Sequence, residues 1–546
     1  MATLNSVIGP GFEGLTSSSQ SWATAMATAS YRTLRIEIDA VEHAARIRKT
    51  DAAPGTCHGS MTNCHSLSTE AHVVPHYAAA LRHLLAVSYH THDAELHPNV
   101  QQRFTDHKGS RSGARRRPLI GQHLELTNAD DVSRANLPQL KENRFWSTGG
   151  AVELRLHRIH AYPAKFPAFI PTKALEFAET EGLRVRRVAD IFCGCGTVAF
   201  EARRVDINFW GCDINPVATL IARTKSGSFD AKLLMQYYAG IAARKERASA
   251  KINLAAAATE RLDYWYSADQ FRRLARLLNA INQTVPARSR YRSFFHCAFS
   301  NILKATSRWL TKSIKPQVDP RKKPADPWDT FAKQFEMMKS AFEQSAVESS
   351  NGAQILTANF LTLDNAPRDI DLLITSPPYV TSYEYADLHQ LSSLWLGYAS
   401  DYRDLRNGSI GSTQHEIEFN REIKRLNTIG NQVVFGLFDR DRSIARSTAK
   451  YFLDMQAVSR RCHDLLRRKS LALFVIGNTE YKGVRIDNAA HLAESLLRGG
   501  FSSVRVAKRK MSGKILTPYR DSIGQFSRRN DGRHVYGEEF ILIAAK

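Results

Sequence analysis

The sequence of 546 residues has no apolar run of about 18 residues, the length that a helix needs to cross a bilayer. Its first residues lack the basic segment and apolar segment of a secretory signal peptide, so we expect none. The seven cysteines form no paired pattern that would indicate a disulfide framework. These absences argue against a membrane protein or a disulfide-rich secreted protein, and they favour a cytoplasmic location.

A zinc pattern is also lacking in the histidine-rich segment 56–97, where the cysteines and histidines do not combine into four ligands. We therefore expect no metal site. We interpret residues 1–145 as an N-terminal extension that is poorly ordered. Within it, residues 108–118 are typical of a flexible basic linker, and contact with phosphates and simple solvation are equally compatible with that composition.

Positive charge, by contrast, is abundant. Lysine and arginine number 75 against 53 acidic residues, which gives a net charge of +22. A basic excess of this size predicts a polyanionic partner, with nucleic acid first and an anionic membrane second. A basic soluble protein without such a partner is the remaining interpretation.

Alternating strand and helix patterns begin after residue 157. RRVADIFCGCGT and NFWGCDINP are apolar runs that flank a short helix at 198–204, which predicts a βαβ unit and a parallel sheet. Residues 228–350 show helical patterns, and strand patterns return in AQILTANF and DIDLLITS. We expect a helical insertion within an α/β domain. The late runs FSSVRVAKR and HVYGEEFILIAA are expected to form an antiparallel hairpin at the sheet edge.

The glycine-rich turn predicts a ligand site at the end of its strand. Gly194 and Gly196 allow a tight bend and a close approach to the backbone. Asp213 ends the next strand, where its carboxylate can accept both hydroxyls of a ribose. The pattern indicates a nucleoside-bearing cofactor. Ala199 stands where the third glycine of G-x-G-x-x-G would be, which disfavours NAD without excluding it.

A second motif, Ser-Pro-Pro-Tyr, decides between cofactors. The sequence resembles the S-adenosylmethionine-dependent DNA methyltransferases that modify exocyclic amino groups, either cytosine N4 or adenine N6. The resemblance covers residues 155–546. It rests on HAYPAKFPAFIP (160–171), DIFCGCGT (190–197), GCDINP (211–216), TSPPYVTSYEYADLHQLSSLWLG (375–397), IGS (410–412), FVIGN (474–478) and EEFILIAAK (538–546).

The resemblance implies a Rossmann-like class I methyltransferase sheet, mostly parallel with an antiparallel last strand. The domain would consist of residues 146–227 and 351–546, and the insertion 228–350 would recognise the target. In such proteins the first two stretches hold the methionine portion of the cofactor, the acidic residue holds the ribose, and the residue after the third strand faces the adenine. The cofactor-binding residues implied are Tyr162, Lys165, Phe166, Pro167, Asp190, Phe192, Gly194, Gly196, Thr197, Asp213 and Asn359.

Four residues, Ser376, Pro377, Pro378 and Tyr379, match the catalytic turn. An exocyclic amine is a poor nucleophile because its lone pair is delocalised into the ring. The Ser376 hydroxyl and the Pro377 carbonyl are acceptors that can bend the amino group out of conjugation. Pro378 stiffens the turn, and Tyr379 offers a face for a flipped base. No metal and no covalent base intermediate are required, and no cysteine follows a proline as cytosine C5 methylation would need.

Serine at the first motif position favours cytosine N4, and adenine N6 stays open. An RNA or protein amide methyltransferase and a DNA-binding protein that has lost catalysis are the two competing interpretations. Double-stranded DNA is the expected partner, and the resemblance leaves open a cognate restriction endonuclease or another defence protein. Tyr383 and Asp387 are candidates for the base pocket. Candidate DNA contacts lie in three basic clusters: Lys312, Lys315, Arg321, Lys322 and Lys323; Arg403, Arg406, Arg421, Lys424 and Arg425; and residues 508–529.

Overall fold

The computed structural model of the chain divides into two compact units, residues 1–117 and 118–546. The residues that the structure describes belong to the second unit: 123–147, 152–163, 165–345, 352–380, 385–411, 418–510, three short strands within 519–534, and 538–546. The histidine-rich segment, the linker 108–118 and Tyr383 lie outside the described residues. Within the described part of the chain, every helix is too short or too polar to span a membrane.

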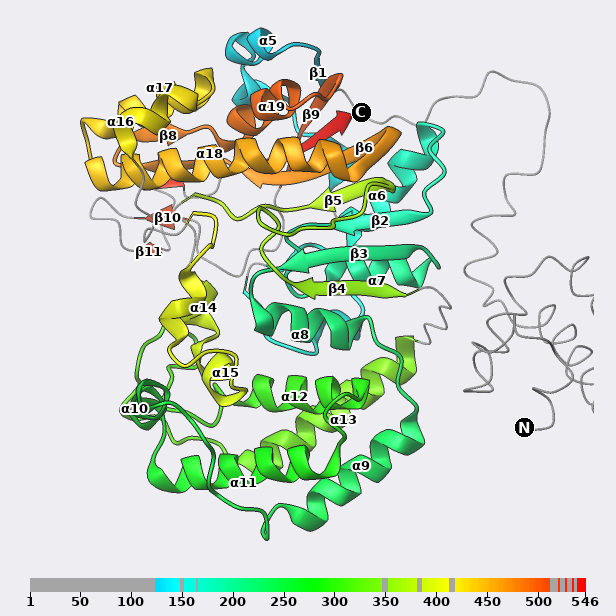
Figure 1. Cartoon of the computed structure of the whole chain (residues 1–546), viewed down its shortest axis with the longest axis vertical. Helices are drawn as coiled ribbons and strands as arrows, with labels where there is room; N and C mark the ends of the chain where they lie inside the picture. The colour runs from blue at the N-terminus through cyan, green and yellow to red at the C-terminus, as the bar shows by residue number, and fades with distance from the viewer. Residues whose placement is uncertain are drawn as a thin grey trace, which may run out of the picture. The chain divides into compact units, whose positions relative to one another are not determined.

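An eight-stranded sheet forms the centre of this unit (Figure 1). From one edge to the other its strands are β1 (Leu124–Leu126), β9 (Ser503–Arg509), β13 (Glu539–Ala545), β6 (Leu466–Gly477), β5 (Ile370–Thr375), β2 (Arg187–Asp190), β3 (Asn208–Asp213) and β4 (Ala353–Thr357). The strands from β6 to β4 are parallel, whereas β13 runs antiparallel to both of its neighbours. The predicted α/β class, with a mostly parallel sheet and an antiparallel last strand, is confirmed.

The position of the late hairpin differs from the prediction. Strand β13 lies inside the sheet between β6 and β9, and β1 pairs with the outer side of β9. The reason is that β13 is apolar on both faces: Leu542 packs into one core, and Ile541 and Ile543 pack into the other. Because β1 belongs to the sheet, the sheet begins at residue 124, earlier in the chain than the domain boundary expected at 145.

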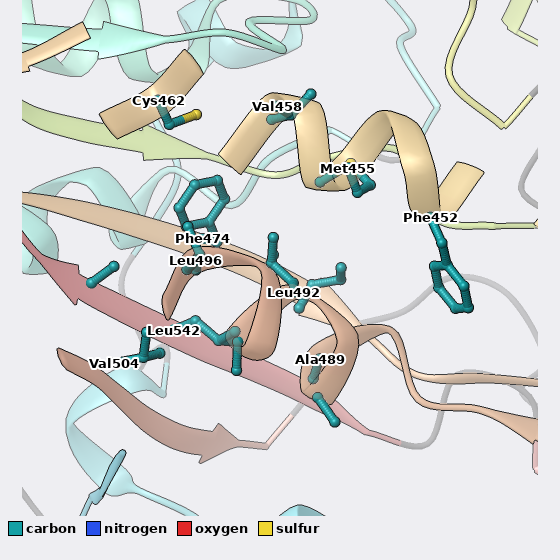
Figure 2. Packing of buried hydrophobic residues seen from close by; sticks show 14 of the residues in the cluster. Phe452, Met455, Val458, Cys462, Phe474, Ala489, Leu492, Leu496, Val504 and Leu542 are labelled. Carbon is teal, nitrogen blue, oxygen red and sulfur yellow. The ribbon is translucent and has the colours of Figure 1, made fainter. Parts of the chain in front are cut away.

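Helices cover both faces of the sheet. The helices packed on one face are α5 (Ala129–Arg134), α17 (Thr428–Phe438), α18 (Arg442–Leu465) and α19 (Asn488–Arg498), and those on the other are α6 (Phe169–Thr180) and α7 (Thr197–Arg204). Figure 2 shows that α18 turns apolar side chains at helical spacing, among them Met455 and Cys462, toward α19 and the sheet. Phe474 of β6 and Leu542 of β13 complete this core. The strand ends are thereby held in fixed positions.

The helical insertion follows α8 (Pro216–Lys225) and precedes β4. Its helices are α9 (Ala231–Arg244), α10 (Ala256–Trp265), α11 (Ala268–Thr284), α12 (Arg290–Ile302) and α13 (Pro327–Ser345). They enclose a core of their own, rich in phenylalanine, that continues onto α8 and α15 (Gln390–Trp395). In Figure 1 the insertion lies beyond α8, on the β4 side of the sheet. Through α15, this core also contacts the segment that follows the Ser-Pro-Pro-Tyr turn.

Candidate active site

The glycine-rich turn connects β2 to α7 at the carboxyl end of the sheet. Gly196 has φ +75°, and a Cβ on it would lie 2.6 Å from the Cα of Ala222 in α8. Gly194 has φ +46°, and its Cβ would lie 3.6 Å from the hydroxyl oxygen of Tyr162. Only glycine satisfies both the left-handed backbone and the close packing at position 196. Cys193 and Cys195 of this turn are buried.

Asp213 ends β3 and ties this strand to the turn. Its Oδ2 accepts a hydrogen bond from the Gly194 amide, and its Oδ1 accepts one from the Asn215 amide, both at 2.8 Å. Burial raises the pKa of Asp213, and the two amide hydrogen bonds act in the opposite direction. Each carboxylate oxygen retains a further lone pair that can accept from a ligand hydroxyl.

Tyr162 brings the predicted HAYPAKFP segment to the same place, where its ring stacks on His389 with centroids 5.1 Å apart. Asn215 Oδ1 caps α8 by accepting from the amides of Val217 (2.9 Å) and Ala218 (3.4 Å), so Asn215 Nδ2 faces His389 Nδ1 at 2.8 Å. The imidazole Nδ1 is therefore an acceptor. Burial lowers the pKa of His389 to about 3, so the ring is neutral. Sequence reasoning gave no role to Asn215 or His389, because an Asn-Pro pair indicates only a helix start.

Lys165 and Asn359, by contrast, are engaged by the protein itself. The Lys165 ammonium donates to Glu153 Oε2 at 2.7 Å and to the carbonyl of His157 at 3.0 Å. Asn359 follows β4, and its Nδ2 donates to the Gly408 carbonyl at 3.1 Å. No contact in the described residues joins Lys165 to the glycine turn.

The remaining residues of the predicted cofactor set have mixed surroundings. Phe166 packs against the core beside α6, whereas Phe192 packs against the core on the other face of the sheet. The Pro167 carbonyl accepts from the Ile170 amide at 3.1 Å, at the start of α6. Thr197 is buried as the first residue of α7.

The Ser-Pro-Pro-Tyr turn begins where β5 ends, beside the glycine turn. Thr375, the last residue of β5, shares a hydrogen bond of 2.7 Å with Asp190 Oδ1 at the end of β2. The same oxygen accepts from the Phe192 amide at 3.1 Å. Burial raises the pKa of Asp190 to about 7. Two motifs that lie far apart in the sequence are thus joined by one hydrogen bond.

The hydroxyl of Ser376 has a fixed direction. It donates to the Val475 carbonyl of β6 at 3.0 Å. The Tyr379 hydroxyl is a second hydrogen-bonding neighbour of this group. When the proton is used in the bond to Val475, the lone pairs of Oγ act as acceptors. Pro377 is buried, and Pro378 and Tyr379 are half-buried. The turn therefore presents a pre-oriented acceptor at the end of the strand.

The Tyr379 ring is held by strands from the end of the chain. Its hydroxyl bonds Glu539 Oε1 of β13 at 3.2 Å, and Glu539 forms a buried ion pair with Arg509 of β9. A Cβ on Gly477 of β6 would lie 3.1 Å from the ring, so the glycine lets the ring pack close to this strand. Burial raises the pKa of Tyr379 well above its usual value, and the hydroxyl stays protonated. EEFILIAAK was part of the resemblance, but no residue in it had a predicted role.

Beyond the turn, Asp387 lies in α14 (Tyr385–Leu388) and forms an ion pair with Arg406. The carboxylate of this base-pocket candidate is therefore already paired with a cation of the protein. Leu391, Leu394 and Trp395, which recur at helical spacing, are buried, and Leu388 is half-buried. In the described ranges, no three histidine, cysteine or acidic residues gather in a way that could hold a metal ion.

Comparison with known proteins finds no family model that matches the sequence. The chain is 24% identical over 372 residues to a type II methyltransferase, M.MvaI, of Kocuria varians. This similarity spans 62% of the chain and 80% of the relative. It supports methyl transfer as the reaction class.

Two structures of the rRNA methyltransferase aviRa from Streptomyces viridochromogenes align with TM-scores of 0.23 and 0.21 and identities of 9% and 12%. The alignments span 72% and 64% of this chain, and 90% and 94% of the respective structures. Superpositions with scores this low carry no functional inference.

Proposed function

We propose that the chain is a site-specific DNA methyltransferase that moves a methyl group from S-adenosylmethionine to an exocyclic amino group of a flipped base, with cytosine N4 favoured. The observation that carries the proposal is the orientation of Ser376. Its proton is committed to the Val475 carbonyl at 3.0 Å, which leaves its lone pairs to serve as acceptors. One residue earlier, Thr375 joins this strand to Asp190 beside the glycine turn.

The residues around the glycine turn fit the cofactor. Asp213 retains lone pairs for two ribose hydroxyls, and Tyr162 lies beside the Gly194 backbone at the same turn. When bound, S-adenosylmethionine supplies a methyl group activated by a positively charged sulfonium. The neutral imidazole of His389 adds no positive charge near that sulfonium, because burial holds its pKa at about 3.

The catalytic turn would act on the amino group through position and electrostatics. Ser376 Oγ and the Pro377 carbonyl accept its N–H bonds, which favours a tetrahedral nitrogen and stabilises the positive charge that develops on it. Tyr379 supplies the face on which the base stacks, and Glu539 fixes the rotation of that ring. Such acceptors accelerate the reaction because they need no reorganisation at the moment of transfer.

Adenine N6 is the alternative target, because the same turn geometry serves both amines. The serine at position 376 favours cytosine, and the asparagine more typical of RNA and protein amide enzymes is absent from it. The net charge of +22 supports duplex DNA as the substrate. A cytoplasmic location and a cognate restriction endonuclease or defence partner belong to the same proposal.

The test is incubation with labelled S-adenosylmethionine and unmethylated duplex DNA, followed by digestion to nucleosides and mass spectrometry. N4-methylcytosine is the expected product. N6-methyladenine would keep the enzyme class and change the base. Label found only in RNA or protein would overturn the DNA assignment.

A further inference from the structure

The basic residues of the insertion fall into two groups with different surroundings. Lys304 and Lys322 point inward: Lys322 Nζ donates to the carbonyls of Lys304 (2.8 Å) and Trp309 (2.7 Å), and Lys304 Nζ donates to the Ser313 carbonyl (2.7 Å). Burial lowers the pKa of both lysines. These two cations close the loop 303–323 on itself. Lys322 therefore has a structural role, although it was a candidate DNA contact.

Four other cations of the same loop are exposed: Lys312, Lys315, Arg321 and Lys323. Within the part of the chain that the structure describes, none of the four pairs with a carboxylate. Their charges are thus not neutralised by the protein. The insertion as a whole, residues 228–345, has 21 lysines and arginines against 10 acidic residues.

The loop has a defined shape because aromatic residues anchor it. Trp309 is buried, bridges to Val318 across the loop and stacks on Trp265 of α10 with ring centroids 4.9 Å apart. Arg308 donates to the Tyr264 carbonyl at 2.6 Å. Tyr264 itself is 51% exposed, and the Arg261 guanidinium lies over its ring, 4.9 Å from the centroid.

A chain of hydrogen bonds runs from this loop to the segment after the catalytic turn. Trp265 Nε1 and Arg261 Nε both donate to Gln390 Oε1, at 3.0 and 2.7 Å. Gln390 Nε2 donates to the carbonyl of Asp387 at 2.8 Å. Asp387 and Gln390 belong to α14 and α15, the first described helices after Tyr379. The loop is therefore tied to α14 and α15.

We propose that Lys312, Lys315, Arg321 and Lys323, together with the neighbouring face of Tyr264, bind the phosphate backbone of double-stranded DNA; we call this set the Trp309-loop surface. The inference rests on the proposed function. Exposed cations without carboxylate partners can neutralise phosphates without breaking an ion pair, and mobile lysine tips suit phosphates better than base edges. Fixed by Trp309 and Gln390, the loop would hold the duplex at a constant position relative to α14 and α15.

The experiment measures duplex binding by fluorescence anisotropy over a range of salt concentrations. The test variant carries K312Q, K315Q, R321Q and K323Q. The matched control removes the same charge from exposed cations elsewhere in the insertion, through K232Q, R247Q, K251Q and R288Q. Each phosphate contact contributes about 0.9 to the slope of log affinity against log salt, so the test variant should lose about 3 to 4 from that slope. The control should lose less than about 1, the equivalent of one contact.

Equal slopes for the two variants would overturn the inference, even where the parent protein methylates DNA. A parent that neither binds nor methylates duplex DNA would overturn the proposed function as well. Binding of the same two variants to phosphatidylserine vesicles tests whether the loop binds an anionic membrane instead of DNA. If the loop substitutions abolish vesicle binding and leave DNA binding unchanged, the surface faces an anionic membrane and the inference is wrong.

Discussion

Replacing Ser376 by alanine separates its structural contribution from its chemical one. The substitution removes a hydroxyl that donates to the Val475 carbonyl at 3.0 Å. One such bond contributes about 1 kcal/mol to stability, so the free energy of unfolding should fall by about that amount. Strands β5 and β6 pair along their length through backbone bonds that the substitution leaves intact.

The effect on methyl transfer should be larger. Removing one pre-oriented group that stabilises developing charge typically lowers kcat by about 10²- to 10³-fold, or about 2.7–4 kcal/mol. The assay is single-turnover transfer of label to a duplex, with cofactor affinity measured by calorimetry in parallel. Cofactor affinity should be unchanged, because the Ser376 side chain bonds to Val475 of β6 and, in the described residues, not to the glycine turn. Ser376→Thr keeps a hydroxyl and should recover part of the rate.

If the Ser376→Ala variant transferred methyl groups as fast as the parent protein, the acceptor role of Ser376 would be refuted. A fall in rate that matches a fall in cofactor affinity would instead mean that Ser376 acts through the junction between Thr375 and Asp190. The same conclusion would follow if the loss of unfolding free energy greatly exceeded about 1 kcal/mol.

Three further predictions concern the surroundings of the turn. Gly196→Ala should cost about 1–3 kcal/mol more than Gly182→Ala in urea unfolding, because φ is positive at both glycines (+75° and +77°) but only a Cβ on Gly196 meets α8. Burial raises the pKa of Asp190 to about 7 from an unfolded value of about 3.9, so the folded state binds more protons between these values. Stability should therefore fall as pH rises through that window, and Asp190→Asn should flatten the curve. Tyr379→Phe and Glu539→Ala should each slow transfer, and the loss in the double variant should be smaller than the sum of the two single losses, because both substitutions remove the hydrogen bond between Tyr379 and Glu539. Additive losses would contradict this last expectation.

Much of the sheet could be predicted because its strands have local signatures. The runs around Asp190, Asp213 and Thr375 are apolar and end in turn residues, and the structure places a parallel strand at each. The order of the last strands in the sheet could not be predicted from local sequence patterns. Strand β13 is an interior strand because both of its faces are apolar, but an apolar run does not say which neighbours it pairs with.

The basic clusters show a second limit of sequence reasoning. Lys322 and Lys323 are adjacent in the chain, yet the first is turned onto the Trp309 carbonyl and the second is exposed. Similarly, Arg406 pairs with Asp387, which no spacing rule connects to it. Composition predicts that the insertion attracts an anion, but the sorting of cations into structural and available groups depends on the fold of the loop.

The orientation of the Ser-Pro-Pro-Tyr turn depends most strongly on distant residues. Thr375, Ser376 and Tyr379 are oriented by β2, β6 and β13, through Asp190, the Val475 carbonyl and Glu539. A local motif can supply acceptors and a ring, but it cannot fix where the hydroxyl proton points or how the ring rotates. Under the proposed function these groups need no reorganisation during the reaction, so the order of the strands in the sheet would contribute to the rate. A substitution at Glu539 should therefore alter transfer without contacting the base.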